Sequence, residues 1–361
     1  MNCDSLSLPT QHGSLNVRWG RRMLGYIQKY KDLSFRLLSG PAILAPALIV
    51  GFGLVGCWWV ARDPKPRTSV QGARSAPQSA SERQTYVLVG AGDIASCKNP
   101  EGARATAKLI EQIPGAVFAA GDLAYEKGSA ADFKNCYDPA WGRFKERTKP
   151  ALGNHEYADP TASGYFQYWG AQAGPAGKGY YSYDLGDWHI VVLNTNCDAK
   201  ELGGCAARSS QETWLKEDLA KHPKACILAY GHHALFSSGL FKNHAVHPEL
   251  KQLWDDLYAA HADLVLAGHE HSYERFAPQD PEGKADPANG IREIVAGTGG
   301  RSHDLLGFAT PNSEVREWDT YGVLKLTLSP GKYAWEFIPE EGKTFHDAGS
   351  GVCHNYPTES N

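Results

Sequence analysis

The chain has 361 residues, and 42% of them are hydrophobic, which is enough for the core of one large domain or two ordinary ones. This composition excludes a disordered protein. The formal net charge is only -4, and no long stripe of lysine and arginine accompanies the motifs described below, so a nucleic-acid-binding protein is not expected.

The first 84 residues are predicted to form three segments. Residues 1–36 are a basic cytoplasmic tail, residues 37–61 contain no charged residue, and residues 62–84 have the Pro, Ser and Gln content of a flexible linker. The uncharged run is long enough to cross a hydrocarbon core of ~30 Å. We expect a transmembrane signal anchor that places the remaining chain outside the cytoplasm, on the periplasmic or extracellular face. A cleaved signal peptide and a lipoprotein acylated at Cys57 are the alternatives.

The folded region is predicted over residues 85–355, with a short tail at 356–361. From apolar runs and helical periodicity we predict, in chain order, a strand at 86–89, a helix at 103–113, a strand at 117–120, hairpin strands at 180–185 and 188–193, a helix at 211–222, a strand at 226–230, a helix at 250–260, a strand at 264–267, and strands at 291–296, 321–328 and 333–337. Helices that alternate with buried strands, followed by late hairpins, indicate an α/β fold in which helices flank two packed sheets.

Six cysteines lie in the part predicted to be exported, and an even number is what a disulfide framework requires: Cys97, Cys136, Cys197, Cys205, Cys226 and Cys353. Cys197 and Cys205 flank a short Gly-rich loop and are the first expected pair. Cys97 with Cys136 is the second. Cys226 begins an apolar strand, so a buried free thiol is an alternative for it.

Five short polar motifs occur in order along the folded region, and most of them follow an apolar run: Gly92-Asp93, Gly121-Asp122-Leu123-Ala124-Tyr125, Gly153-Asn154-His155-Glu156, Gly231-His232-His233 and Gly268-His269-Glu270-His271. A Gly-Asp pair alone is typical of a turn. Because the carboxyl ends of strands in an α/β sheet line a common crevice, we expect the five motifs to meet there. Asp, His and Asn side chains bind divalent and trivalent ions, and a carboxylate can bridge two ions ~3.5 to 4 Å apart. The motifs therefore predict a two-metal hydrolase.

At these residues the sequence resembles the calcineurin-like metallophosphoesterases, and more narrowly the exported bacterial type of purple acid phosphatase. The first motif continues as Asp93-Ile94-Ala95 and lacks the histidine usual in the superfamily. Tyr125 fits the phenolate ligand that purple acid phosphatases use in its place. The resemblance covers about residues 85–354. It implies a four-layer α/β/β/α sandwich of two mixed sheets.

The resemblance also implies a role for each matching residue. Seven ligands are implied for a binuclear centre: Asp93, Tyr125 and His271 for Fe(III), Asn154, His232 and His269 for a divalent Fe, Zn or Mn ion, and Asp122 as the bridge. His232 is preferred to His233 because it follows its strand directly. His155 would contact the phosphate or protonate the leaving group. His244 is a further catalytic candidate, at a spacing that departs from the plant enzymes.

The implied reaction is hydrolysis of a phosphate monoester by a metal-bound hydroxide. A phosphodiesterase or nucleotidase with the same binuclear site is the nearest alternative. An alternative of another class is a membrane-anchored binding protein with an inactive site. The expected partners are a phosphate ester substrate and, through the N-terminal segment, a membrane.

Overall fold

The computed structural model describes residues 84–224, 226–240 and 246–356. The predicted basic tail, the uncharged run at 37–61 and nearly all of the linker lie outside these residues, as does His244. Among the helices of the described ranges, none combines the length and the apolar character that crossing a membrane requires.

The first sheet has six strands and is mixed. Its order is β15 (Ala348–Val352), β14 (Lys332–Pro339), β13 (Gly322–Ser329), β1 (Tyr86–Ala91), β3 (Ala116–Ala120) and β5 (Thr148–Ala151). Strands β1, β3 and β5 run parallel to one another, whereas β13 pairs antiparallel with β1. The carboxyl ends of the three parallel strands therefore meet at one edge of the sheet.

The second sheet has seven strands and is also mixed. Its order is β12 (Ser313–Glu317), β10 (Tyr273–Phe276), β11 (Arg292–Ala296), β9 (Leu264–Ala267), β8 (Cys226–Tyr230), β7 (Trp188–Val192) and β6 (Tyr181–Leu185). Strands β7, β8, β9 and β11 are parallel. A two-stranded ladder joins β2 (Ala95–Ser96) to β4 (Ala124–Tyr125).

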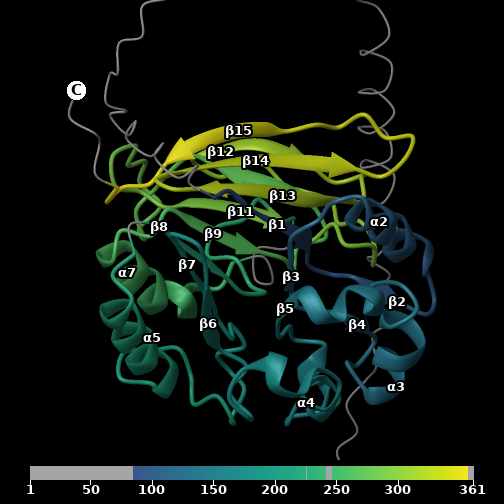
Figure 1. Cartoon of the computed structure of the whole chain (residues 1–361). Helices are drawn as coiled ribbons and strands as arrows, with labels where there is room; N and C mark the ends of the chain where they lie inside the picture. Colours follow the sequence, from purple (N-terminus) through teal and green to yellow (C-terminus); the bar gives the residue numbers. More distant parts are fainter. Residues whose placement is uncertain (1–83, 225, 241–245, 357–361) are drawn as a thin grey trace, which may run out of the picture. The chain divides into compact units, whose positions relative to one another are not determined.

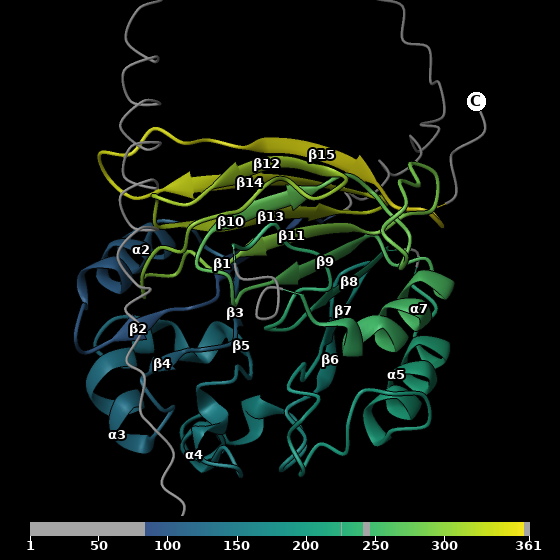
Figure 2. The ribbon, with the colours of Figure 1, turned by 180° about the vertical axis from the view of Figure 1, so that it is seen from behind.

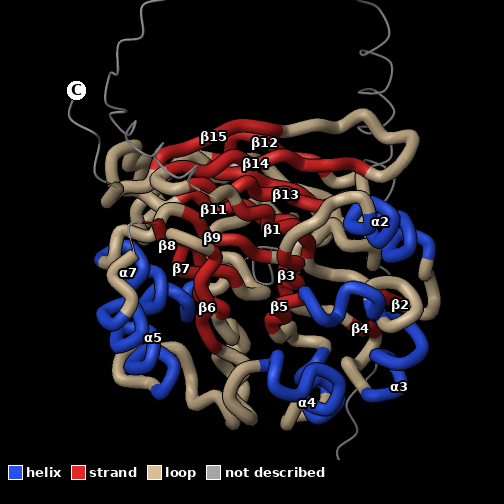
Figure 3. Tube along the Cα trace, viewed as in Figure 1, coloured by secondary structure: helices blue, strands red, loops and turns tan. Residues whose placement is uncertain are grey.

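Helices cover the outer face of each sheet, as the side views show (Figures 1 and 2). The helices are α2 (Glu101–Glu111), α3 (Ala130–Asp132), α4 (Ser163–Trp169), α5 (Ser210–Lys221) and α7 (Lys251–Ala259). Helices α2 and α4 share a core with the six-stranded sheet, and α5 and α7 share one with the seven-stranded sheet. Strands β1, β3, β5 and β6 to β9 lie between the two groups of helices, whereas β12, β14 and β15 extend beyond them (Figure 3). This arrangement agrees with the predicted α/β class.

The core between the two sheets follows from the alternation of side chains along each strand. In β1, Leu88 points toward the second sheet, where it joins Trp188 and Leu228 in one buried cluster. Its neighbour Val89 points the other way and packs with Ile110 of α2. Strands β1, β3, β8 and β9 thus have both faces buried, which explains why their sequences are almost continuously apolar.

All six cysteines of the folded region form disulfides. Cys97 pairs with Cys136 and Cys197 with Cys205, which confirms the two predicted pairs. Cys226 pairs with Cys353, so the alternative of a free thiol at Cys226 is wrong. Cys353 follows β15 directly. The sequence offered no local sign of this pair because its members are 127 residues apart.

A buried histidine links β7 to helix α5. His189 is 1% exposed and has both ring nitrogens 2.9 Å from carboxylates, Nδ1 from Asp184 and Nε2 from Asp218. Burial acts to lower the pKa of His189, but the hydrogen bonds and charges of the two aspartates outweigh it and raise the pKa above its ordinary value. Because both ring nitrogens face carboxylates, the protonated ring stabilises the fold.

This ion pair predicts a pH-dependent stability. Because the pKa of His189 is higher in the folded state, its contribution is complete below about pH 6.5 and is lost as the pH rises through the folded-state value. Replacing His189 by glutamine should lower the free energy of unfolding by about 2 kcal/mol near pH 6. Urea unfolding should show a large difference in unfolding free energy between wild type and variant near pH 6, and a smaller one at an alkaline pH above the folded-state pKa of His189. An equal difference in unfolding free energy at both pH values would contradict this role of His189.

Candidate metal centre

The predicted ligands follow the ends of five strands drawn from both sheets. Asp93, Asp122 and Asn154 come after β1, β3 and β5, and His232 and His269 come after β8 and β9. These strands are parallel within their sheets, so their carboxyl ends open onto a shared crevice. The structure thus brings together side chains that are up to 178 residues apart, from Asp93 to His271.

The backbone turns sharply at three of these residues. Asp93, Asp122 and His269 have φ values of 59°, 50° and 70°, in the left-handed region that side chains other than glycine rarely adopt. Each such residue costs of order 1 kcal/mol or more. One compensation is the bond that the His269 N–H donates to Asp93 Oδ2, at 2.7 Å. Strain of this kind concentrates at functional sites.

One group of ligand atoms surrounds the phenol of Tyr125. Its oxygen lies 2.8 Å from Asp93 Oδ1 and 3.1 Å from His271 Nε2, and these two atoms are 3.2 Å apart. Ser302 Oγ lies 2.6 Å from Nδ1 of His271, which directs Nε2 toward the group. The three side chains that the resemblance assigns to a ferric ion therefore converge.

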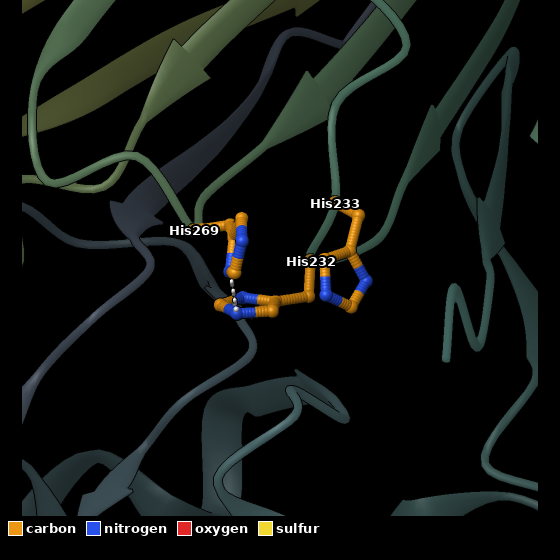
Figure 4. Close-up of side chains that lie close together, drawn as sticks. All are labelled: His232, His233 and His269. Carbon is orange, nitrogen blue, oxygen red and sulfur yellow. Dashed lines mark hydrogen bonds between the residues drawn. The ribbon is translucent and has the colours of Figure 1, made fainter. Parts of the chain in front are cut away.

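A second group surrounds Nε2 of His232. This atom lies 3.1 Å from Asn154 Oδ1 and 3.2 Å from His269 Nδ1, and Figure 4 shows the two rings approaching each other. Asp122 lies between the groups, since its Oδ2 is 3.0 Å from the Tyr125 oxygen and 3.3 Å from His232 Nε2. A single carboxylate oxygen thus touches both sets of predicted ligands.

The two neighbouring histidines after β8 have different surroundings. His232 donates from Nδ1 to the Ala120 carbonyl at 2.9 Å, which leaves Nε2 facing Asp122 and Asn154. His233 has its Nδ1 3.0 Å from Thr195 Oγ. Burial and the charge of His232 lower the pKa of His233 well below its ordinary value. The geometry favours His232 for the role that the sequence assigned to it.

The charges of the site fit cations. Asp93 and Asp122 are almost fully buried, and buried carboxylates need positive charge nearby. Burial works to raise the pKa of Asp93, yet His271 holds it below its ordinary value. Burial likewise opposes protonation of His232, but Asp122 outweighs it and raises the pKa to about 10. Two buried carboxylates that need positive charge beside them are what a cation site requires.

Glu156 positions the ligand loops, a role that the sequence analysis did not assign. It is 0% exposed and accepts four backbone N–H bonds, from Asp122 and Gly153 at Oε2 and from Leu123 and Ala124 at Oε1. These bonds fasten the loop after β3 to the loop after β5. Glu156 was visible in the sequence as the last residue of the Gly-Asn-His-Glu motif.

His155 lies at the mouth of the site. The Glu126 carbonyl only accepts, so His155 Nδ1 donates to it at 2.7 Å, and Nε2 lies 3.8 Å from Asp122 Oδ2. A cavity of about 480 Å³ lies in front of these groups, with Asp122, Asn154, His155, His269 and His271 in its lining. The second catalytic candidate, His244, lies outside the described residues.

Comparison with known proteins identifies the family. Residues 86–273, just over half of the chain, match the family model for calcineurin-like phosphoesterases. The chain belongs to the calcineurin-like phosphoesterase family. Within that family, curated relatives are purple acid phosphatases. Purple acid phosphatase 23 of Arabidopsis thaliana is 32% identical over 207 residues, which are 46% of this chain and 43% of the relative.

A second relative carries a different description. Probable inactive purple acid phosphatase 1 of Arabidopsis thaliana is 27% identical over 286 residues, 67% of this chain and 44% of the relative. This chain spans about half the length of the curated relatives it matches. Its whole-protein activity therefore has to be argued from the site.

Solved structures share the fold. A purple acid phosphatase from yellow lupin (Lupinus luteus) seeds has a TM-score of 0.58 at 19% identity, over 78% of this chain and 57% of that one. GAP50, described as the anchor in the inner membrane complex of Plasmodium, also has a TM-score of 0.58, at 14% identity over 76% of this chain and 90% of that one.

The purple acid phosphatases imply a binuclear metal centre, and the donor set here fits one. Asp93, Asp122 and His232 offer ligand atoms within 4.8 Å of one another.

Proposed function

We propose that the chain is a binuclear metal-dependent phosphatase that hydrolyses phosphate monoesters. The observation that carries the proposal is the position of Asp122 Oδ2, 3.0 Å from the Tyr125 oxygen and 3.3 Å from His232 Nε2. One carboxylate between two separate donor groups is the arrangement that a shared ligand of two cations needs. Asp93, Tyr125 and His271 would hold Fe(III), and Asn154, His232 and His269 would hold a divalent Fe, Zn or Mn ion.

Two cations at these ligands would neutralise charge on the phosphoryl oxygens and make a water molecule nucleophilic. The water oxygen forms a bond to phosphorus as the bond between phosphorus and the ester oxygen breaks, and the leaving alkoxide takes up a proton. His155 is placed for this step, because Nε2 is directed toward Asp122 and the side chain lines the cavity at 34% exposure. The backbone carbonyl of Glu126 fixes the orientation of the His155 ring by accepting a hydrogen bond from Nδ1.

The experiment that tests the proposal compares an aryl phosphate with the corresponding bis-aryl ester, using metal-loaded protein. Preferential release of phosphate from the monoester supports it. Faster cleavage of the bis-ester would assign the chain to the phosphodiesterases with the same ligands. Bound metal without turnover of either ester would assign it to the inactive binding proteins.

The ferric assignment predicts a change of colour. Burial, Asp122 and Asp93 raise the pKa of Tyr125 well above its ordinary value, so the phenol keeps its proton until a cation replaces it. Iron-loaded wild type should absorb visible light through a tyrosinate-to-iron transition, and Tyr125→Phe should abolish that band. Tyr165→Phe is the control, because Tyr165 is equally buried and donates to the Pro150 carbonyl instead. A colourless wild type whose metal content Tyr125→Phe leaves unchanged would contradict the assignment.

The proposal includes an exported domain tied to a membrane. Three disulfides support an oxidising compartment, and the uncharged run at 37–61 supports an anchor. Protease treatment of intact cells tests this part. Digestion of the folded domain from outside supports export, and protection of a domain with free thiols would contradict it.

A further inference from the structure

Large exposed apolar side chains are concentrated beside the site. Among the described residues five are exposed, and three of these, Leu240, Leu305 and Phe308, belong to two adjoining loops. Their exposed fractions are 49%, 63% and 99%. The other two, Trp318 and Val352, are on other segments. Exposed apolar groups gathered in one place mark a binding surface more often than scattered ones do.

The two loops are joined to each other and to the cavity. Leu240 N–H donates to the Leu305 carbonyl at 3.3 Å, and Gly307 N–H donates to the Ser238 carbonyl at 2.6 Å. Leu240 and Leu305 line the cavity of about 480 Å³ that also contains Asp122 and Asn154. We call Leu240, Leu305 and Phe308 the apolar rim.

Buried hydrogen bonds hold the rim in place. Glu274 is 1% exposed and accepts from both the backbone N–H and the hydroxyl of Ser238, at 2.7 and 2.5 Å. Thr310 N–H donates to the same hydroxyl at 2.9 Å, and Arg316 donates to the Gly307 carbonyl at 2.9 Å. These bonds anchor both loops, so little ordering would accompany binding at the rim.

We infer that the apolar rim binds the hydrocarbon part of an amphiphilic substrate, a phosphate monoester of a long-chain alcohol. This inference rests on the proposed function, which places the phosphate at the ligand groups. Since Leu240 and Leu305 line the same cavity as Asp122 and Asn154, an alkyl chain attached to that phosphate reaches them without leaving the cavity. Covering the rim removes apolar surface from water, which a small polar alcohol cannot do.

A second cavity, of about 440 Å³, also borders Asn154. It does not reach the rim, because Leu240 and Leu305 line only the cavity that also contains Asp122. An alkyl chain bound in this second cavity would leave the rim uncovered, so its dependence on chain length would survive substitution of the rim residues.

The test measures kcat/KM for alkyl phosphates from ethyl to decyl, each below its micelle concentration. We expect kcat/KM to rise about twofold per added methylene, because a methylene covered on one side gains about half of the full transfer free energy. The double variant Leu305→Ser with Phe308→Ser should flatten this slope. Val352→Ser is the control, because Val352 is 76% exposed in β15 and lies in neither loop. It should keep the wild-type slope.

The outcomes separate the inference from the proposed function. A slope near zero in wild type, or an equal slope in the double variant, would overturn the inference while phosphatase activity stands. For a protein that releases no phosphate, calorimetry with alkylphosphonates makes the same comparison. Affinity that rises with chain length would then support the rim and overturn only the hydrolysis. Affinity independent of chain length would overturn the inference. Light scattering that shows a dimer in wild type and a monomer in the double variant would also overturn it, because the rim would then be a dimer contact.

Discussion

Replacing Asp122 by asparagine is expected to lower kcat/KM for a phosphate monoester by about 10³-fold or more. Metal ions supply several kcal/mol of charge stabilisation in such reactions, and each 1.36 kcal/mol is about tenfold in rate. Asparagine matches aspartate in size but offers one neutral oxygen. In one orientation its amide NH₂ would replace the oxygen that lies between Tyr125 and His232, and in the other it would face the His155 N–H. Steady-state kinetics and metal analysis of the purified variant measure the effect. At least one ion should be lost.

The matched control is Asp187→Asn, because Asp187 is exposed in the turn between β6 and β7. It makes the same chemical change and should leave kcat/KM and metal content at wild-type values. Thermal unfolding of both variants checks that they fold. Full activity in Asp122→Asn would show that the carboxylate is not shared between two ions.

The second large effect is expected from Glu156→Leu. The substitution removes a buried acceptor of four backbone N–H groups, and leaving such groups unpaired should lower the free energy of unfolding by about 3 to 5 kcal/mol. Metal affinity should fall by about 10- to 100-fold as well, because the loops carrying Asp122 and Asn154 lose their common anchor. Denaturant unfolding and metal titration measure the two effects separately.

Glu293→Leu separates stability from positioning. Glu293 is also 0% exposed and accepts backbone N–H bonds from Leu235 and Phe236, but it contacts no predicted ligand. We expect this variant to be less stable and to keep its metal affinity. Equal loss of metal affinity in the Glu156 and Glu293 variants would show that Glu156 acts through general stability alone.

Part of the convergence of the predicted ligands could be foreseen, because most of them closely follow a strand that was predicted from its apolar run. The strand at 117–120 was predicted from its apolar run, and β3 is Ala116–Ala120, so the position of Asp122 just beyond it was known. The rule that the carboxyl ends of parallel strands share a crevice then placed it beside residues from other strands. Side-chain positions around Tyr125 required the structure.

Other elements carried too little local signal. Strand β5 reads Thr-Lys-Pro-Ala and β15 reads Ala-Gly-Ser-Gly-Val, neither of which has a strand-like pattern. Both form because a neighbouring strand supplies hydrogen-bond partners. One helix boundary also differs between prediction and structure. The helix predicted at 103–113 is α2 at Glu101–Glu111, because it starts directly after Pro100, which lies at its N-cap.

The role of Glu156 and the apolar rim escaped prediction for a different reason. Each depends on contacts between loops distant in sequence, such as Leu240 with Leu305. Periodicity describes one segment at a time and carries no information on such pairs. The same limit applies to Arg301, whose guanidinium pairs with Glu126 at 3.1 Å and so supports the residue that orients His155.

Metal stoichiometry shows whether two cations share Asp122. The purified folded domain should bind two ions per chain, and phosphate release from an aryl phosphate should rise only as the second ion is added. Chelation should abolish this activity, and adding back both ions should restore it. Full phosphate release with one ion per chain, or with none, would contradict the account.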